Sequence, residues 1–256
     1  MGTMLAPHVT PDTDHTLDQA ALLAALRARV ARLEGVPAAR RAGVIEVCPG
    51  LPGMARAALH EVLATEPGCG AAFAAMVLGR TQGTVLWIGS ARSEWQAWPP
   101  GLAAWGLTPD RLVLLRAESW RDALWAMEEA LRCPAVGGTL LVPGQGENFE
   151  QRAPLDLTAT RRLQLAAEAG GGLGLLLRAD TPEAVTQTAA HSRWRVSPAE
   201  GPGGEDEPHW RLELLRARGG RPREAVRVAW HSTSGRLELL EQAAEGPTAR
   251  PIKARR

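Results

Sequence analysis

The chain has 256 residues, of which 45% are hydrophobic and 22% are charged, and its formal net charge is +1. This length and composition predict one large folded domain, or two small ones, with a buried core. No apolar run approaches the roughly 18 residues of a membrane-spanning helix, which excludes an integral membrane protein. The near-zero net charge provides no strong general attraction to nucleic acid.

Residues 1–15 lack the basic start and apolar core of a secretory signal, and we predict that they form a flexible tail. We predict an N-terminal helix over residues 16–36, because Thr16 and Gln19 have the spacing of a capping box. Apolar residues recur there every three or four positions, at Leu22, Leu26, Val30 and Leu33.

The three cysteines, Cys48, Cys69 and Cys133, lie far apart and form no CxxC pattern. An odd number of scattered cysteines fits a reduced protein with neither a disulfide framework nor a zinc site. We therefore expect a cytoplasmic location.

Between residues 40 and 240, short apolar runs alternate with helical patterns. Continuous apolar strands are typical of a parallel sheet that is covered on both faces, and the alternation implies right-handed crossovers. The expected helices are Gly70–Gly79, Ser119–Arg132 and Thr158–Ala169. The expected strands are Val44–Cys48, Ala58–Ala64, Thr84–Ile88, Leu112–Leu115, Thr139–Val142 and Leu173–Leu177.

After residue 199 the pattern changes to strands separated by short glycine-containing gaps, which suit antiparallel connections. We expect three such strands, at His209–Ala217, Ala225–His231 and Arg236–Leu240, and a disordered basic tail over residues 241–256. The predicted fold class is therefore α/β, with a mostly parallel sheet flanked by helices and antiparallel strands at the C-terminal edge.

The segment after the expected strand Ala58–Ala64 has the surroundings of a P-loop, namely a strand, a turn with Gly68 and Gly70, and a helix. A working P-loop places a lysine and a serine or threonine directly after its last glycine, to hold the phosphates and magnesium. Ala71 and Ala72 occupy those positions here. We therefore expect a degenerate P-loop without NTP hydrolysis, catalytic residues or a cofactor.

Two further motifs fail on single positions. His60 and Glu61 begin the HExxH pattern of zinc proteases, but Ala64 stands where the second histidine is required. The strand at Thr139–Val142 is followed by Pro143 rather than by an acidic residue that would support magnesium. We expect no metal site.

Leu155–Glu168 places Arg161 and Arg162 near a helix start, where positive charge opposes the helix dipole. Two interpretations stay open. The arginines pair with Asp156 or Glu168 within the chain, or they contact a partner protein or a phosphate backbone, together with Gln164.

A second basic stretch follows Trp210, and for it too both a binding role and a purely structural role stay open. Its arginines are suited to phosphates or an acidic partner, or they are solubilising charges on an edge strand. These candidate contacts are Arg216, Arg218, Arg221 and Arg223.

Three tryptophans around the turn at residues 99–101 either cover the end of the sheet or form a protein-binding patch: Trp95, Trp98 and Trp105.

Four stretches, at residues 58–62, 85–88, 155–168 and 210–220, resemble the ImuA family, and LDLTATRRLQLAAE and LLRARGGRP are the most specific parts. This family comprises degenerate RecA-like proteins of bacterial DNA-damage operons. The resemblance implies a RecA-like core over residues 40–240 and a role in damage-induced mutagenesis. Residues 49–53 depart from it, because relatives often carry a longer glycine-rich loop there.

The resemblance also implies partners. ImuA proteins work with an ImuB-type protein, which is an inactive Y-family polymerase, and through it with a DnaE-type polymerase in error-prone translesion synthesis. Contact with RecA is implied as well, whereas direct contact with DNA stays open.

Two other functions remain alternatives. A SulA-type cell-division inhibitor, which binds FtsZ, also has a RecA-like fold without a working P-loop, but this chain is longer and has additional C-terminal strands. A nucleotide-binding or DNA-dependent ATPase with an atypical P-loop would need a lysine or arginine supplied from elsewhere.

Overall fold

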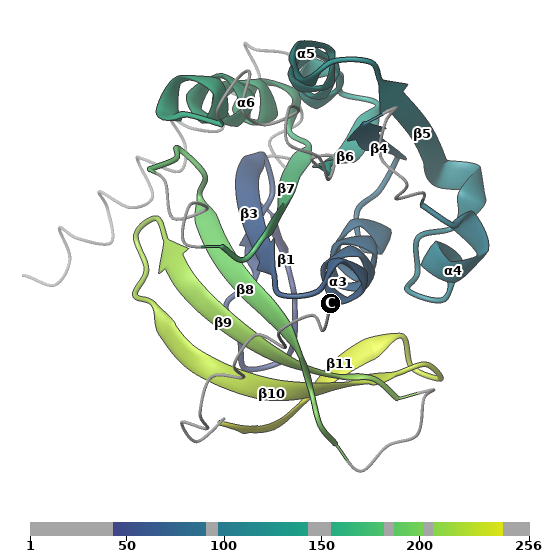
Figure 1. The fold of residues 1–256 in the computed structure, drawn as a ribbon, viewed down its shortest axis with the longest axis vertical. Coiled ribbons are helices and arrows are strands. Elements are labelled where there is room, and N and C mark those ends of the chain that lie inside the picture. Colours follow the sequence, from purple (N-terminus) through teal and green to yellow (C-terminus); the bar gives the residue numbers. More distant parts are fainter. Residues whose placement is uncertain (1–42, 91–96, 143–154, 182–186, 202–206, 243–256) are drawn as a thin grey trace, which may run out of the picture.

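A computed structural model describes residues 43–90, 97–142, 155–181, 187–201 and 207–242 (Figure 1). The predicted tail at 1–15, the predicted helix at 16–36 and residues 243–256 of the predicted C-terminal tail lie outside these ranges. Within them, no helix is long and apolar enough to cross a membrane.

Nine strands form one mixed sheet in the order β11-β10-β9-β8-β3-β7-β6-β4-β5. Six neighbouring strands of this sheet run parallel, namely β8, β3, β7, β6, β4 and β5. On the other side of β8, the pairs β8–β9, β9–β10 and β10–β11 are antiparallel. This arrangement confirms the predicted fold class. The strands are β3 (Ala58–Ala64), β4 (Thr84–Ser90), β5 (Leu112–Ala117), β6 (Val136–Leu141), β7 (Leu173–Ala179), β8 (Ser192–Ala199), β9 (His209–Ala217), β10 (Arg223–His231) and β11 (Arg236–Gln242).

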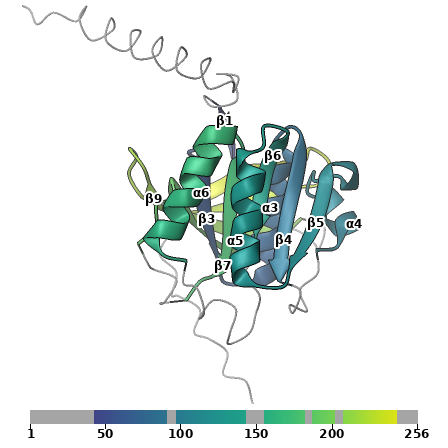
Figure 2. The same ribbon diagram turned by 90° about the horizontal axis from the view of Figure 1, so that it is seen from above.

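Helices cover both faces of the parallel part of the sheet. Helices α5 (Trp120–Arg132) and α6 (Leu157–Gly170) lie side by side on one face, and α3 (Pro67–Gly79) lies on the other (Figure 2). A short helix, α4 (Pro99–Ala103), and a 3₁₀ turn (Pro109–Arg111) precede the edge strand β5.

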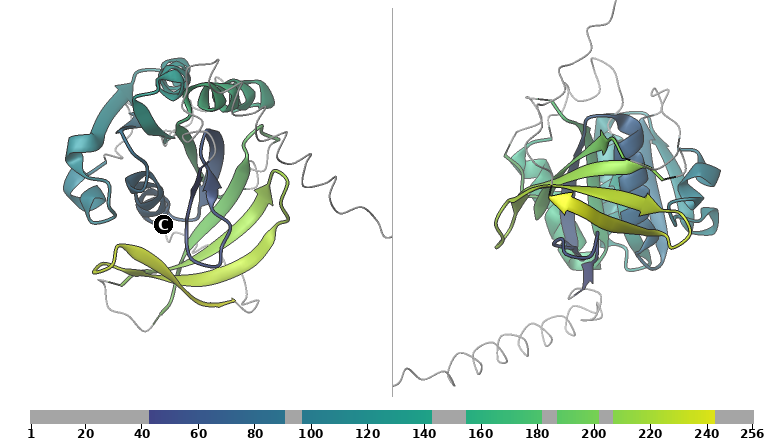
Figure 3. Two further views of the ribbon diagram at one scale, coloured as in Figure 1. Left: turned by 180° about the vertical axis from the view of Figure 1, so that it is seen from behind. Right: turned by 90° about the horizontal axis from the view of Figure 1, so that it is seen from below.

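The antiparallel strands curve around α3 (Figure 3). The nine residues from Gly70 to Leu78 of α3 are all buried, as expected for a helix enclosed on every side. Three tryptophans close this core, with the ring of Trp105 centred 5.1 Å from Trp210 and 5.0 Å from Trp230. Trp98 is 70% exposed instead, and Trp95 lies outside the described ranges.

Local signals set the helix ends. The Ser119 hydroxyl accepts a hydrogen bond from the Asp122 amide at 3.1 Å and thereby caps α5. Asp156 caps α6 in the same way through the Ala159 amide, at 2.7 Å. Gly171 ends α6 in a left-handed conformation, with φ of 81°.

Some predicted boundaries are wrong. Only Val44–Ile45 of the first expected strand is extended, and this strand, β1, pairs with β2 (Met54–Ala55) outside the main sheet. Strand β8 was not expected, because arginines alternate with apolar residues along it. Helix α3 begins at Pro67 rather than Gly70, and β11 extends to Gln242, two residues into the predicted tail.

Gly170 allows the end of α6 to approach the end of α5. A Cβ at this position would lie 1.9 Å from the Leu131 carbonyl oxygen, whereas a Cβ at Gly68 would meet nothing within 4 Å. We predict that Gly170→Ala lowers the free energy of unfolding by about 2 kcal/mol, because backbone must move. Gly68→Ala is the control and should leave stability unchanged or slightly raised. Equal urea midpoints for the two variants would contradict this account.

Candidate partner-binding surface

The connection between β3 and α3, where a P-loop would lie, is very short. Only Thr65 and Glu66 connect β3 to α3, and Pro67 is already the first residue of the helix. Gly68 and Gly70 both lie in the helix, and the Gly70 amide donates to the Glu66 carbonyl at 3.3 Å. The backbone here does not form a wide glycine-rich cradle.

The side chains at this position pack inward. Ala71 and Ala72 are buried, and a Cβ on Gly70 would lie 2.5 Å from the Ala64 Cβ. Gly70 therefore permits close packing of α3 on the sheet. The exposed Glu66 places a carboxylate at the helix N-terminus, where it disfavours a second anion. The chain's one lysine, Lys253, lies outside the described ranges, and within them no cluster of metal-binding side chains occurs.

Helices α5 and α6 form the most distinctive exposed surface. Trp125 of α5 is 62% exposed, and Leu157 and Leu165 of α6 are about half exposed. Between the helices lies a groove of about 420 Å³. We call these three side chains and the groove the α5–α6 surface. The groove is lined by Arg121, Asp122, Leu124, Trp125, Glu128, Ala159, Arg162 and Leu163.

Arg161 and Arg162 behave differently on this surface. Arg162 Nη2 lies 2.5 Å from Glu128 Oε2, so its partner is on α5 and is neither Asp156 nor Glu168. Arg161 is exposed and makes no ion pair with any residue in the described part of the chain. It lies four residues from both Leu157 and Leu165, on one exposed stripe of α6.

Gln164, the third residue expected at this site, points into the protein. Its side chain is buried, its Oε1 accepts a hydrogen bond from the Leu59 amide at 2.9 Å, and its Nε2 donates to Glu168 at 2.8 Å. Gln164 therefore holds α6 against β3.

The four C-terminal arginines do not share one site. Arg216 donates to the carbonyl oxygens of Thr188 at 3.0 Å and Ala190 at 2.8 Å. Arg223 donates to the Gly50 carbonyl at 3.0 Å, and Arg218 lies 3.8 Å from Glu168. Arg221 is exposed on the turn between β9 and β10. Arg216 thus connects β9 to the segment before β8, and Arg223 connects β10 to the loop between β1 and β2.

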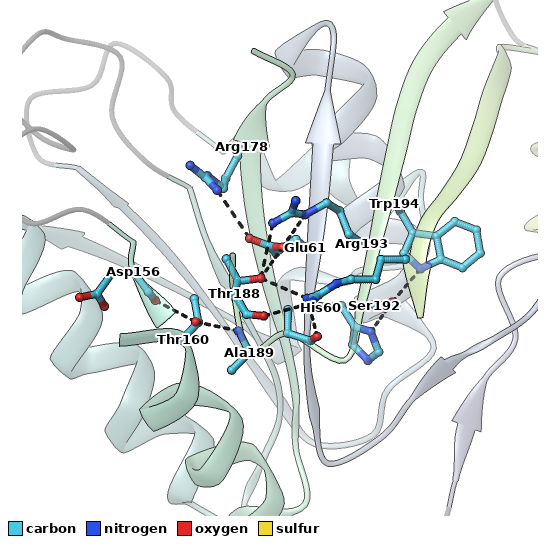
Figure 4. A network of polar contacts seen from close by, with 12 residues as sticks. His60, Glu61, Asp156, Thr160, Arg178, Thr188, Ala189, Ser192, Arg193 and Trp194 are labelled. Carbon is cyan, nitrogen blue, oxygen red and sulfur yellow. Dashed lines mark hydrogen bonds and ion pairs between the residues drawn. The ribbon is translucent and has the colours of Figure 1, made fainter. Parts of the chain in front are cut away.

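A buried carboxylate lies beneath α6 (Figure 4). Glu61, in the middle of β3, is 0% exposed. Its Oε2 accepts hydrogen bonds from Arg193 Nε at 2.7 Å and from the Thr188 hydroxyl at 2.8 Å. Arg178 Nη1 lies 3.6 Å from its Oε1. Both neighbouring strands, β7 and β8, therefore contribute a cation to this one carboxylate.

The same network reaches α6. The Ala189 amide donates to the Thr160 hydroxyl at 2.9 Å, and this hydroxyl donates to the Asp156 carbonyl at 2.8 Å. Glu61 thus fixes Thr188, and the next residue fixes the first turn of α6 (Figure 4). The motifs in the sequence do not reveal this role of Glu61, although a glutamate inside an otherwise apolar strand is a signal for a buried ion pair.

His60 occupies the opposite face of β3. Its Nε2 lies 2.8 Å from the Ala55 carbonyl oxygen, so this nitrogen carries the proton and donates. Its Nδ1 accepts from the Ser192 hydroxyl at 2.7 Å, which itself accepts from the Trp194 indole at 3.0 Å. Burial lowers the pKa of His60 to about 4, so the ring is neutral near pH 7.

Comparison with known proteins agrees with this geometry. The crystal structure of the RadB recombinase superposes with a TM-score of 0.55 and 12% identity, over 74% of this chain and 94% of that one. The fold is therefore that of a RecA-like α/β protein.

Protein ImuA from Caulobacter vibrioides strain NA1000 / CB15N is 35% identical over 213 residues, which cover 75% of this chain and 82% of the relative. The ImuA of strain ATCC 19089 / CIP 103742 / CB 15 matches equally. The chain belongs to the ImuA family. No protein-family model matches the sequence.

The Glu61 cluster yields a stability prediction. We predict that Glu61→Gln lowers the free energy of unfolding by about 3 kcal/mol, because it leaves two largely buried arginines without their carboxylate. Glu129→Gln removes an exposed carboxylate 2.8 Å from Arg132 and should cost about 0.5 kcal/mol. Urea denaturation measures both, and hydrogen exchange should accelerate at Ala189 in the first variant. Wild-type stability of Glu61→Gln would refute the role of this carboxylate.

Proposed function

We propose that this protein is a non-catalytic RecA-like accessory protein of damage-induced, error-prone translesion DNA synthesis. It acts by binding an ImuB-type inactive Y-family polymerase, and through it serves a DnaE-type polymerase. RecA is a second partner in this proposal, and the protein works in the cytoplasm. Membership of the ImuA family and the RecA-like fold support this role.

The geometry at the P-loop position supports a non-catalytic role. Two residues connect β3 to α3, and the positions that follow Gly70 are buried alanines. NTP hydrolysis requires a cation on the phosphates and a ligand for magnesium. Ala71 and Ala72 supply neither the lysine nor the hydroxyl that a P-loop places after its last glycine, so in this proposal the fold serves as a scaffold for binding.

The α5–α6 surface is the observation that carries the binding role. Exposed tryptophan and arginine are the residues most often found at the energetic centre of protein interfaces. Here Trp125 lines the groove from α5, and the exposed Arg161 lies on the neighbouring helix α6, with the half-exposed Leu157 and Leu165 four residues before and after it. Arg162 is already engaged by Glu128, so Arg161 is the arginine available to an acidic partner group.

The test is binding of the purified protein to the ImuB-type protein of the same genome, by biolayer interferometry. Trp125→Ala, and the double variant Arg161→Ala with Arg162→Ala, should each weaken binding at least tenfold while the domain stays folded, because they remove interface contacts and not core packing. Glu128 keeps Arg132 as its partner at 2.5 Å, which limits the structural cost of losing Arg162.

Trp98→Ala is the matched control, because Trp98 is 70% exposed against 62% for Trp125 and directly precedes α4, which lies apart from α5 and α6 (Figure 1). It should bind as the wild-type protein does. Unchanged binding of the folded Trp125 and arginine variants would contradict the proposal, and so would a loss of binding confined to Trp98→Ala.

A further inference from the structure

A second pocket, larger than the α5–α6 groove, opens at the amino-terminal end of β3. The β3–α3 turn lies at the other end of the same strand. The volume of the pocket is about 870 Å³, within the range of small-molecule sites. The lining comes from the turn that enters β3, the last turns of α6, the start of β8 and the end of β9. Its charged and polar side chains are those of Arg56, Gln164, Glu168, His191 and Arg218.

The charges of this pocket favour an anion. The Arg56 guanidinium bonds to no residue within the ranges that the structure describes. Among the residues that the structure places, Arg218 has one acidic partner, Glu168, at the long distance of 3.8 Å. His191 adds a third group that becomes a cation when protonated. Two guanidinium groups from distant segments therefore face one carboxylate, which leaves a surplus of positive charge.

The backbone holds these groups in place. The Arg56 amide donates to the Gly43 carbonyl at 2.8 Å, the Arg218 amide to the His191 carbonyl at 2.7 Å, and the His191 amide to the Leu59 carbonyl at 2.6 Å. Ala57, in the pocket wall, has φ of 51° and is the one non-glycine residue with positive φ in the described ranges. Such strained residues cluster at binding sites.

We propose that this pocket binds a phosphate group, carried by a nucleotide or by a nucleic-acid strand. Arg56 and Arg218 are the primary ligands, since a guanidinium fork matches two phosphate oxygens. Protonated His191 is the third donor. This pocket shares Leu165 with the α5–α6 surface, but its charged groups lie outside that surface and outside the P-loop position, and it involves binding without hydrolysis.

The site predicts a pH dependence. Burial lowers the pKa of His191, and the Arg218 charge lowers it further, while Glu168 acts in the opposite direction. A bound phosphate adds negative charge and raises this pKa, so binding takes up a proton and strengthens as pH falls from 8 to 6. The neighbouring His60 ring, centred 5.6 Å away, stays neutral over this range, and the two arginines stay charged.

Isothermal titration calorimetry of the full chain tests the proposal, with magnesium-free ADP in one arm and 5′-phosphorylated oligo(dT) in the other. Arg56→Gln with Arg218→Gln should weaken binding at least tenfold. The control, Arg116→Gln with Arg211→Gln, removes the same charge at positions that line neither this pocket nor the α5–α6 groove, and it should bind as wild type. Glu168→Gln should tighten binding several-fold, because it removes the competing carboxylate.

Binding of ADP identifies a nucleotide site, and binding of the oligonucleotide alone identifies a strand phosphate; both support the proposal. Binding of neither probe overturns it. Equal losses in the pocket variant and the control variant overturn it too, because they would indicate attraction to net charge alone. Thermal melts confirm that each variant is folded.

Discussion

A single carboxylate buried at the centre of the sheet constrains much of this structure. Glu61 lies in β3 with no solvent exposure, and an unpaired charge there would be strongly unfavourable. Arg193 lies directly beside it in β8, and Arg178 approaches from β7. The carboxylate is therefore satisfied only when β3 lies between these two strands in the observed register. We infer that this buried ion pair contributes more to selecting one strand arrangement than to overall stability.

The hydrogen bonds around Glu61 also fix the position of helix α6, whose outer face is exposed. Glu61 positions Thr188, Ala189 bonds to Thr160 of α6, and Gln164 of the same helix bonds to the backbone of β3. Helix α6 is thus held on its buried side by polar contacts, and the close approach at Gly170 sets its distance from α5. The exposed groove between the two helices depends on these buried contacts, which do not themselves touch a partner.

Local patterns predicted the fold well because its parallel strands are continuous apolar runs and its helices begin at capping residues such as Ser119. Strand β8 escaped prediction because its Arg193 is buried against Glu61 of β3, a pairing between distant segments that no local pattern reveals. The same limit applies to Arg216, whose basic side chain binds backbone carbonyls of residues 188 and 190. The sequence points to Arg162 as a candidate contact, but Trp125, which lines the same groove, belongs to another helix, and only the packed fold brings the two side chains to one groove.

We propose that this RecA-like scaffold is a binding protein, in which a tight, packed turn occupies the P-loop position and the recognition surface lies on α5 and α6. This role is tested most directly by placing a photo-crosslinking amino acid at residue 125 in cells exposed to DNA damage. Mass spectrometry of the crosslinked species should identify an inactive Y-family polymerase, and the same amino acid at residue 98 should not capture it. Capture of FtsZ at residue 125, or of the polymerase from residue 98 alone, would contradict the account.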